Sequence, residues 1–380
     1  MKVYNLNLST GNYKRFPNLH INKFLSKSKD VEFIDTPCDD FYYIVAHITN
    51  WVWYKENPTY DQRLITDLQQ NKAALIISCV WDSLGIIPTY GLQRSPNVLT
   101  LIKETARLFC IEPTKILYTD CNFVVEKVLA NYNFKGIWAN VWENNYNPID
   151  IDSIISDIES KKLRDKKFLY FGGKPREHRL RFLNELLRID DFEKNSYVST
   201  APGNFIETDT NIPKYMESKI LDIDEVTNRD GMNDLDAEAL NPYYHINSYI
   251  NIIPNSYFYT NHTRLEINEK LFKPMLCLQP FILLGEPNTL SALQQLGYKT
   301  FSAWIDESYD TLLDDKKRMD KVIEQINKLN NMSYDQLSDM LYEMLPVLEH
   351  NYNLNLARYN SLEIYDNYVN KVKNYFNQLY

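Results

Sequence analysis

Two short segments of this sequence carry side chains that could bind phosphate groups. The first is the turn Gly172–Arg179, in which two glycines precede several basic residues, namely Lys174, Arg176, His178 and Arg179. The second is Glu266–Lys270, which holds the carboxylates of Glu266 and Glu269 beside the ammonium group of Lys270. Guanidinium and ammonium groups bind phosphate oxygens, and free backbone amides at a helix start do the same. The first segment therefore predicts a site for an anionic ligand.

The elements around the first segment would expose its backbone amides. An apolar run at 167–171 predicts a buried strand, and helical spacing of apolar residues over 180–187 predicts the next helix. In such a strand, turn and helix, the amide of Gly173 and the guanidinium groups of Arg176 and Arg179 can converge on one anion. The alternative is a solvated helix start. Positive charge there opposes the helix dipole, so a bound anion explains the cluster better.

The second segment lies on an amphipathic helix that we expect to begin near Thr263 and to continue to Leu278. Apolar residues at helical spacing form one face, and the charged residues form the other. The ordinary alternative is a solvated face with pairs four residues apart, Glu266 with Lys270 and Glu269 with Lys273, each stabilising the helix by about 0.3 kcal/mol.

An α/β pattern continues after this helix. Residues 281–284 predict a buried strand, residues 289–296 a helix that ends at Gly297, and residues 298–301 a second strand. A loop that follows a buried parallel strand points toward a cleft, so these elements would position the charged segments.

The pair Glu269–Lys270, preceded by Asn268 and followed by this helix and strand, resembles the donor-site motif of the fucosyltransferase-like, inverting glycosyltransferases of the GT-B fold. Asn268 replaces the Ser or Thr of that motif. The run 297–310 is similar to glycosyltransferase-like proteins of bacteriophages, and the resemblance covers residues 166–325. It implies that Glu269 and Lys270 hold the ribose and phosphates of a nucleotide-sugar, that Gly172–Arg179 is a phosphate-contacting loop, and that neither a metal nor another cofactor is needed.

Inverting transfer requires a base near the acceptor hydroxyl. The candidates are Asp82, Asp120 and His47, because each follows a predicted strand of the N-terminal half, where the carboxyl edge of a parallel sheet faces the ligand. Asp82 is the first choice. The alternative for each is a helix cap or a turn residue.

The length of 380 residues favours two domains. Strands alternate with helices in both halves, which predicts two Rossmann-like, doubly wound domains with a cleft between them and a helical C-terminal tail. The polar stretch 143–150 suggests a linker. We therefore predict an acceptor-side domain at 1–155, a donor domain at 156–330 and a tail at 331–380, which could cross back to the first domain.

The net charge of −9 argues against binding that depends mainly on neutralising nucleic-acid phosphates. No apolar run reaches the length of a membrane span, and the five cysteines lack metal or disulfide spacing. We expect a cytoplasmic protein. Abundant Asn, Lys, Ile and Tyr indicate an AT-rich genome, such as that of a bacteriophage, so the location would then be the host cytoplasm.

Three functional classes are consistent with these patterns. The first is a glycosyltransferase that moves a sugar to a glycan, a protein or a modified DNA base. The second is another phosphate-binding α/β enzyme, such as an epimerase or a phosphorylase. The third is a non-enzymatic sugar-binding or virion-associated protein on the same fold. Asp222 with Asp224, and Asp234 with Asp236, leave a metal-dependent transferase as a further alternative.

Overall fold

The structure is a computed structural model that describes residues 1–7, 24–47, 62–79, 98–139, 149–173, 176–200, 240–260 and 264–380. The chain forms two compact units. Unit 1 comprises Met1–Val141, Asn261–Ile267 and Asn360–Tyr380, and unit 2 comprises Trp142–Thr260 and Asn268–Tyr359. Each unit contains one parallel sheet with helices, so the predicted α/β class agrees with the structure, and the two sheets are compatible with a Rossmann-like layout of two domains.

Unit 1 contains a six-stranded parallel sheet in the order β2-β1-β3-β4-β5-β6. The strands are β1 (Lys2–Asn7), β2 (Glu32–Ile34), β3 (Tyr42–His47), β4 (Ala73–Cys79), β5 (Ile116–Asp120) and β6 (Lys135–Trp138). Every residue of β5 is buried, as expected for a strand of a parallel sheet that helices cover on both faces.

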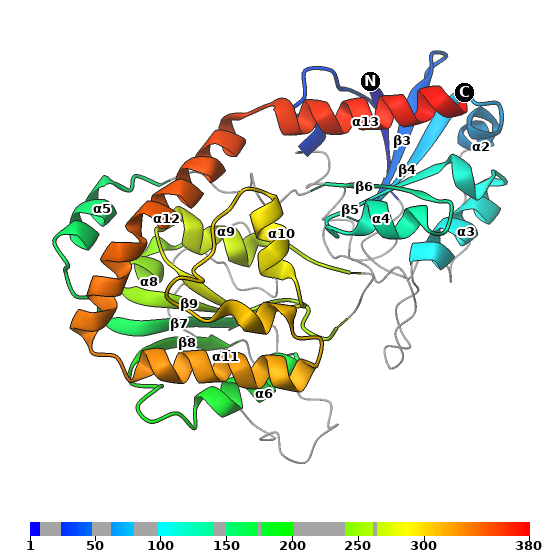
Figure 1. The fold of residues 1–380 in the computed structure, drawn as a ribbon. Helices are drawn as coiled ribbons and strands as arrows, with labels where there is room; N and C mark the ends of the chain where they lie inside the picture. Colours follow the sequence, from blue (N-terminus) through cyan, green and yellow to red (C-terminus); the bar gives the residue numbers. More distant parts are fainter. Residues whose placement is uncertain are drawn as a thin grey trace. The chain divides into compact units, whose positions relative to one another are not determined.

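Helices α2 (Gln62–Gln69), α3 (Val98–Phe109) and α4 (Val125–Ala130) contribute to one core with alternate residues of the strands, such as Ile44 and Ile77. The opposite face meets α13 (Glu363–Leu379), whose Phe376 packs edge-to-face against Tyr43 with ring centroids 5.7 Å apart. The predicted tail is therefore helical, and its last helix belongs to unit 1 (Figure 1).

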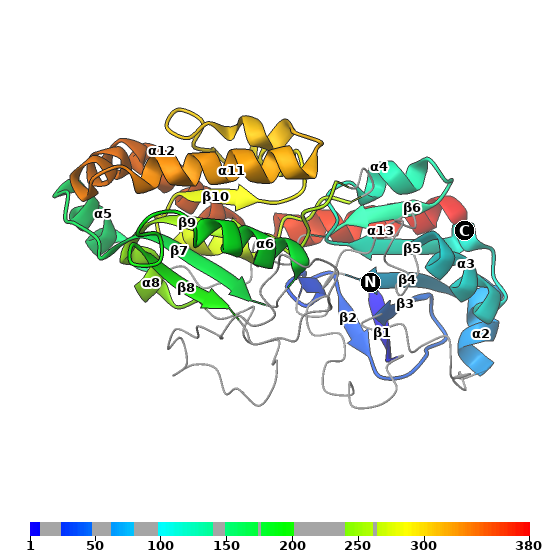
Figure 2. The same ribbon diagram turned by 90° about the horizontal axis from the view of Figure 1, so that it is seen from below.

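Unit 2 is built on a four-stranded parallel sheet in the order β10-β9-β7-β8 (Figure 2). The strands are β7 (Lys166–Gly173), β8 (Ser196–Thr200), β9 (Ser248–Pro254) and β10 (Phe281–Leu284). After β7 the chain first adds β8 on one side and then β9 on the other. The order of the strands thus reverses between β7 and β9, and ligands of open α/β sheets bind at the carboxyl ends of such a pair.

Helices cover both faces of this sheet (Figure 1). The helices of unit 2 are α5 (Asp152–Glu159), α6 (Glu177–Leu186), α8 (Pro242–Ile246), α9 (Glu269–Leu276), α10 (Thr289–Gln295), α11 (Asp315–Asn330) and α12 (Tyr334–Asn360). Helices α6 and α11 contact each other on one face, whereas α8 and α9 contact β9 from the other. Helices α6 and α9 both begin at the carboxyl edge, since each follows a strand of this parallel sheet.

Two boundaries differ from the predicted division of the chain. Unit 2 already begins at Trp142, rather than after residue 155, and the predicted tail divides between the units at Asn360. The short segment Asn261–Ile267 belongs to unit 1, where Phe123 donates a backbone hydrogen bond of 2.8 Å to Leu265.

This pairing corrects the predicted start of the helix near Thr263. The helix begins at Glu269, because Asn268 is its N-cap and accepts a hydrogen bond of 3.2 Å from the amide of Lys270. Thr263 itself lies outside the described residues. Ile267, the residue before the cap, belongs to unit 1 and follows the bridge residue Glu266, so apolar spacing alone placed the helix start too early.

The prediction of a second strand at 298–301 was also wrong, since these residues form no strand. Both backbone groups of Lys299 hydrogen bond to the buried side chain of Asn351 on α12, at 2.8 and 2.9 Å. A single asparagine thus takes the place of a neighbouring strand. Ser196–Thr200 forms β8, and residues 201–239 after it lie outside the described residues.

Candidate functional site

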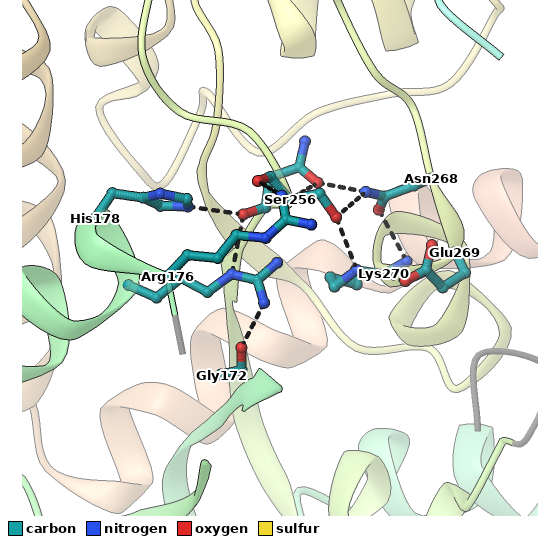
Figure 3. A network of polar contacts seen from close by, with 9 residues as sticks. Gly172, Arg176, His178, Ser256, Asn268, Glu269 and Lys270 are labelled. Atoms are coloured by element: carbon teal, nitrogen blue, oxygen red, sulfur yellow. Dashed lines mark hydrogen bonds and ion pairs between the residues drawn. The ribbon is translucent and has the colours of Figure 1, made fainter. Parts of the chain in front are cut away.

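The candidate site lies at the carboxyl ends of β7 and β9 in unit 2. Three segments meet there: the start of α6 with Arg176, the loop after β9 with Asn255 and Ser256, and the start of α9 with Asn268 and Lys270 (Figure 3). These segments are far apart in the sequence. Their meeting follows from the sheet order, because β7 and β9 are neighbours and each leads into this edge.

Arg176 and Lys270 both reach Ser256. The guanidinium group of Arg176 donates to the Ser256 carbonyl, and the Nζ atom of Lys270 lies 3.4 Å from the Ser256 Oγ atom. The Arg176 guanidinium also lies over the ring of Tyr257, 5.1 Å from its centroid. Two cations therefore converge on one neutral residue, next to the starts of two helices. Both the charge and the helix dipoles make this position favourable for an anion.

Glu269 supplies one negative charge beside them. Its carboxylate forms an ion pair with Lys270, and the two side chains are 13% and 24% exposed. Burial by itself would raise the pKa of the Glu269 carboxyl, but the charge and hydrogen bond of Lys270, with the charge of Lys273, outweigh it and lower the pKa below the ordinary value. Glu269 is therefore ionised at neutral pH and can accept hydrogen bonds.

His178 and Arg179 point into the protein rather than toward solvent. Each is 4% exposed, and both donate to the carbonyl of Asn255, at 3.0 Å from His178 Nε2 and 3.2 Å from Arg179 Nε. Arg179 also donates to the Gly172 carbonyl at 2.7 Å. Arg179 thus joins the ends of β7 and β9, and the N–H donors of both side chains are used by carbonyl oxygens of the fold.

Gly173 ends β7 with φ +56°, where a side chain is strained, and the register with β8 shifts at this point. Lys174, the next predicted donor residue, lies outside the described residues.

Glu266 does not join this group. It belongs to unit 1, is 2% exposed and forms an isolated antiparallel bridge with Asn122. The predicted segment 266–270 is therefore divided: Glu269 and Lys270 lie at the unit 2 site, and Glu266 forms part of the core of unit 1.

The three candidate bases stay predictions. Asp120 ends β5 and is fully buried; Tyr118 donates to one carboxylate oxygen at 2.7 Å and the amide of Asn122 to the other at 3.1 Å. Those bonds give the carboxylate a structural role in unit 1. His47 ends β3, and Asp82 lies outside the described residues.

Asn255 and Ser256 are the site residues that sequence reasoning missed. Asn255 is fully buried, and its Oδ1 atom accepts from the amide of Ser256 at 2.8 Å and from Asn268 Nδ2 at 2.6 Å. Their position directly after the apolar run Tyr249–Pro254 was the available signal, since the carboxyl ends of buried parallel strands carry ligand sites.

Comparison with protein-family models and with curated proteins gives no match to this chain. Among the described residues, no group of three His, Cys, Asp or Glu side chains is arranged to hold a metal ion. The helices in the described ranges also include none with the length and apolar composition that a membrane span requires.

Proposed function

We propose that this chain is a glycosyltransferase of GT-B type, and that unit 2 binds the diphosphate of a nucleotide-sugar donor between Arg176 and Lys270. The observation that carries the proposal is the convergence of these two cations on Ser256, at the strand pair where the sheet order reverses. The resemblance of Glu269–Lys270 and its flanking run to the fucosyltransferase-like family supports the same assignment.

The charges suit the chemistry of this transfer. When the bond between the sugar and the phosphate breaks, negative charge develops on the departing diphosphate, and fixed cations stabilise that charge. Arg176 and Lys270 would do so, while the ionised Glu269 would accept hydrogen bonds from the ribose hydroxyls, as the family resemblance implies. The proposal also includes inversion at the transferred sugar and transfer without a metal. Its base lies in unit 1 and is one of Asp82, Asp120 and His47.

The acceptor is a hydroxyl of a glycan, a protein or a modified DNA base. A glycan or a protein fits the charge better, because a chain with a net charge of −9 is repelled by nucleic acid. Incubation of the enzyme with a radiolabelled nucleotide-sugar and each acceptor class would identify the acceptor through the label that it gains.

The direct test is nucleotide binding. Calorimetry and thermal unfolding in the presence of UDP, GDP, ADP, CMP and their common sugars should show one nucleotide that binds and raises the melting temperature. Arg176→Ala and Lys270→Ala should each weaken that binding at least about tenfold, because a charged hydrogen bond is worth about 1.5 kcal/mol or more.

Matched controls are Arg188→Ala and Lys316→Ala. Arg188 lies just beyond the end of α6, Lys316 lies on α11, and their side chains are 63% and 85% exposed. Both control variants should bind the nucleotide as the wild type does. Absence of binding by every nucleotide would overturn the proposal and favour a non-enzymatic sugar-binding protein on this fold.

A further inference from the structure

Arg318 on α11 is 1% exposed, and all five N–H groups of its guanidinium have partners. Its Nε donates to the carbonyl of Gly285 at 3.0 Å. Its Nη1 reaches the carbonyl of Leu312 at 2.6 Å and the hydroxyl of Thr260 at 3.3 Å. Its Nη2 donates to the carbonyl of Phe258 and to Asp315 Oδ1. One side chain thus ties α11 and the end of β10 to the segment after β9.

That segment, Asn255–Thr260, is called the β9 loop below. Asp315 strengthens its attachment, because the same Oδ1 atom accepts from the amide of Thr260 at 2.9 Å. The Arg318 guanidinium also lies over the ring of Phe258, 4.6 Å from its centroid, and that ring stacks on His178. Arg318 and Asp315 therefore hold Phe258 and Thr260, at the far end of the β9 loop.

The first residue of the β9 loop is fixed independently. The amide of Asn255 donates to the carbonyl of Leu284 at 2.9 Å, and the carbonyl of Asn255 accepts from His178 and Arg179. Ser256 lies between the two attached ends. Its carbonyl meets Arg176 and its hydroxyl meets Lys270.

We infer that Arg318 is a positioning residue for the candidate site. By holding the far end of the β9 loop, it sets where Ser256 stands between Arg176 and Lys270, without itself contacting the donor. The identity of the ligand rests on the proposed function; the ordering of the loop does not. A displacement of about 1 Å in a site of this kind can cost up to about a hundredfold in activity.

Arg318→Lys is the informative substitution. Lysine keeps the charge but has three donors on one nitrogen, so it cannot reach the five acceptors that the planar guanidinium spans. Arg164 supplies the matched control, since it is also a buried arginine of unit 2 bonded to carbonyls, those of Ser248 at 2.7 Å and His245 at 3.3 Å. These lie at the amino end of β9, away from the β9 loop.

The first measurement is affinity for UDP, GDP, ADP and pyrophosphate by calorimetry. We expect Arg318→Lys to weaken the binding of the preferred nucleotide about tenfold, and Arg164→Lys to leave it within about twofold. Thermal unfolding of both variants shows whether they lose comparable stability. Equal affinities in the two variants would overturn the inference.

The second measurement is hydrogen–deuterium exchange of the β9 loop amides, which requires no ligand. Arg318→Lys should raise exchange at Ser256–Thr260, and Arg164→Lys should leave it unchanged. If no probe binds to the wild type, the proposed function fails, and exchange alone then decides the positioning role. Unchanged exchange in Arg318→Lys would refute it.

Discussion

The two ends of β9 in unit 2 carry the same kinds of side chain and use them differently. At the amino end, Arg164 donates to the carbonyls of His245 and Ser248, beside the C-terminal end of α8. At the carboxyl end, Arg176 and Lys270 stand at the starts of α6 and α9. Both ends combine arginine, histidine and amide side chains, so composition alone does not distinguish them.

The helix dipole explains the difference. Helices end near the amino edge of a parallel sheet with free carbonyls, which bind a cation directly, and they begin near the carboxyl edge with free amides, which oppose one. Lys167 shows the same rule at the start of β7, where its ammonium binds the carbonyls of Asn330 and Met332 at the end of α11. Arg164 and Lys167 at the amino edge therefore stabilise the fold through helix-end carbonyls, whereas Arg176 and Lys270 at the carboxyl edge are the cations proposed to bind an anion.

The largest expected effect concerns His245 at the amino end. Its Nδ1 atom lies 2.7 Å from Gln279 Oε1, and since Gln279 Nε2 donates to Ser248, that oxygen is the acceptor and His245 the donor. Burial lowers the pKa of His245 to about 4, although the hydrogen bond to Gln279 opposes the shift. The folded protein thus binds the proton more weakly than the unfolded chain. The resulting stability is complete above pH 6.5 and is lost as the pH falls to about 4.

Over that interval His245 should contribute about 3 kcal/mol to the decline in the free energy of unfolding. Urea titrations of the wild type and of His245→Asn between pH 4 and 7 measure it, and the variant should lose this part of the slope. His350→Gln is the control and should keep the full slope. If the variant and the wild type have parallel slopes, burial of His245 beside Gln279 does not hold the imidazole neutral, and the prediction is wrong.

An intermediate effect is expected at Gly173, at the carboxyl end. A Cβ atom there would lie 3.5 Å from Arg179 Nη1, which is ordinary contact, so φ +56° is the source of strain. Gly173→Ala should lower the free energy of unfolding by about 1 kcal/mol, and Gly173→Asn by less, because Asn tolerates this backbone conformation better. Urea denaturation ranks the variants. Equal losses would place the cost in contacts of the added side chain instead.

The smallest expected effect concerns Glu269 and tests how charge at the carboxyl end affects the binding of an anion. Glu269→Gln removes the one negative charge paired with Lys270, so inorganic pyrophosphate should bind about threefold more tightly, in keeping with the strength of partly exposed ion pairs. Glu185→Gln is the control, since Glu185 pairs with Arg188 on an exposed surface. Calorimetry at low salt measures both. Weaker pyrophosphate binding by Glu269→Gln would mean that the carboxylate, and not the cations, organises the site.

Local patterns predicted much of the fold because buried parallel strands leave a clear trace. The runs that form β9 and β10 are fully buried, and the run 281–284 that forms β10 was predicted as a strand. Strands β1 and β2 were missed, because polar residues interrupt the first and only three residues form the second. The prediction of a strand at 298–301 was wrong, because the backbone of Lys299 bonds to the side chain of Asn351 and not to another strand. Asn351 lies about fifty residues later in the sequence, so no local pattern shows this contact.

The sequence predicted part of the candidate site, because residue types and short-range spacing are visible in it. A basic turn after a strand is visible in the sequence, and so is a Glu-Lys pair on an amphipathic helix. The sequence does not show in which direction each side chain points. His178 and Arg179 turn inward to Asn255, whereas Arg176 and Lys270 meet at Ser256.

By itself, the sequence determined the α/β class, most strands and helices of both units, and the two charged segments, since these depend on periodicity and residue type over short distances. Only the tertiary structure decided which charges meet. That outcome depends on the order β10-β9-β7-β8, which makes neighbours of two strands about eighty residues apart, and on Arg318, which attaches the β9 loop to α11. Contacts of this kind arise from sheet order and burial, and no local pattern encodes them.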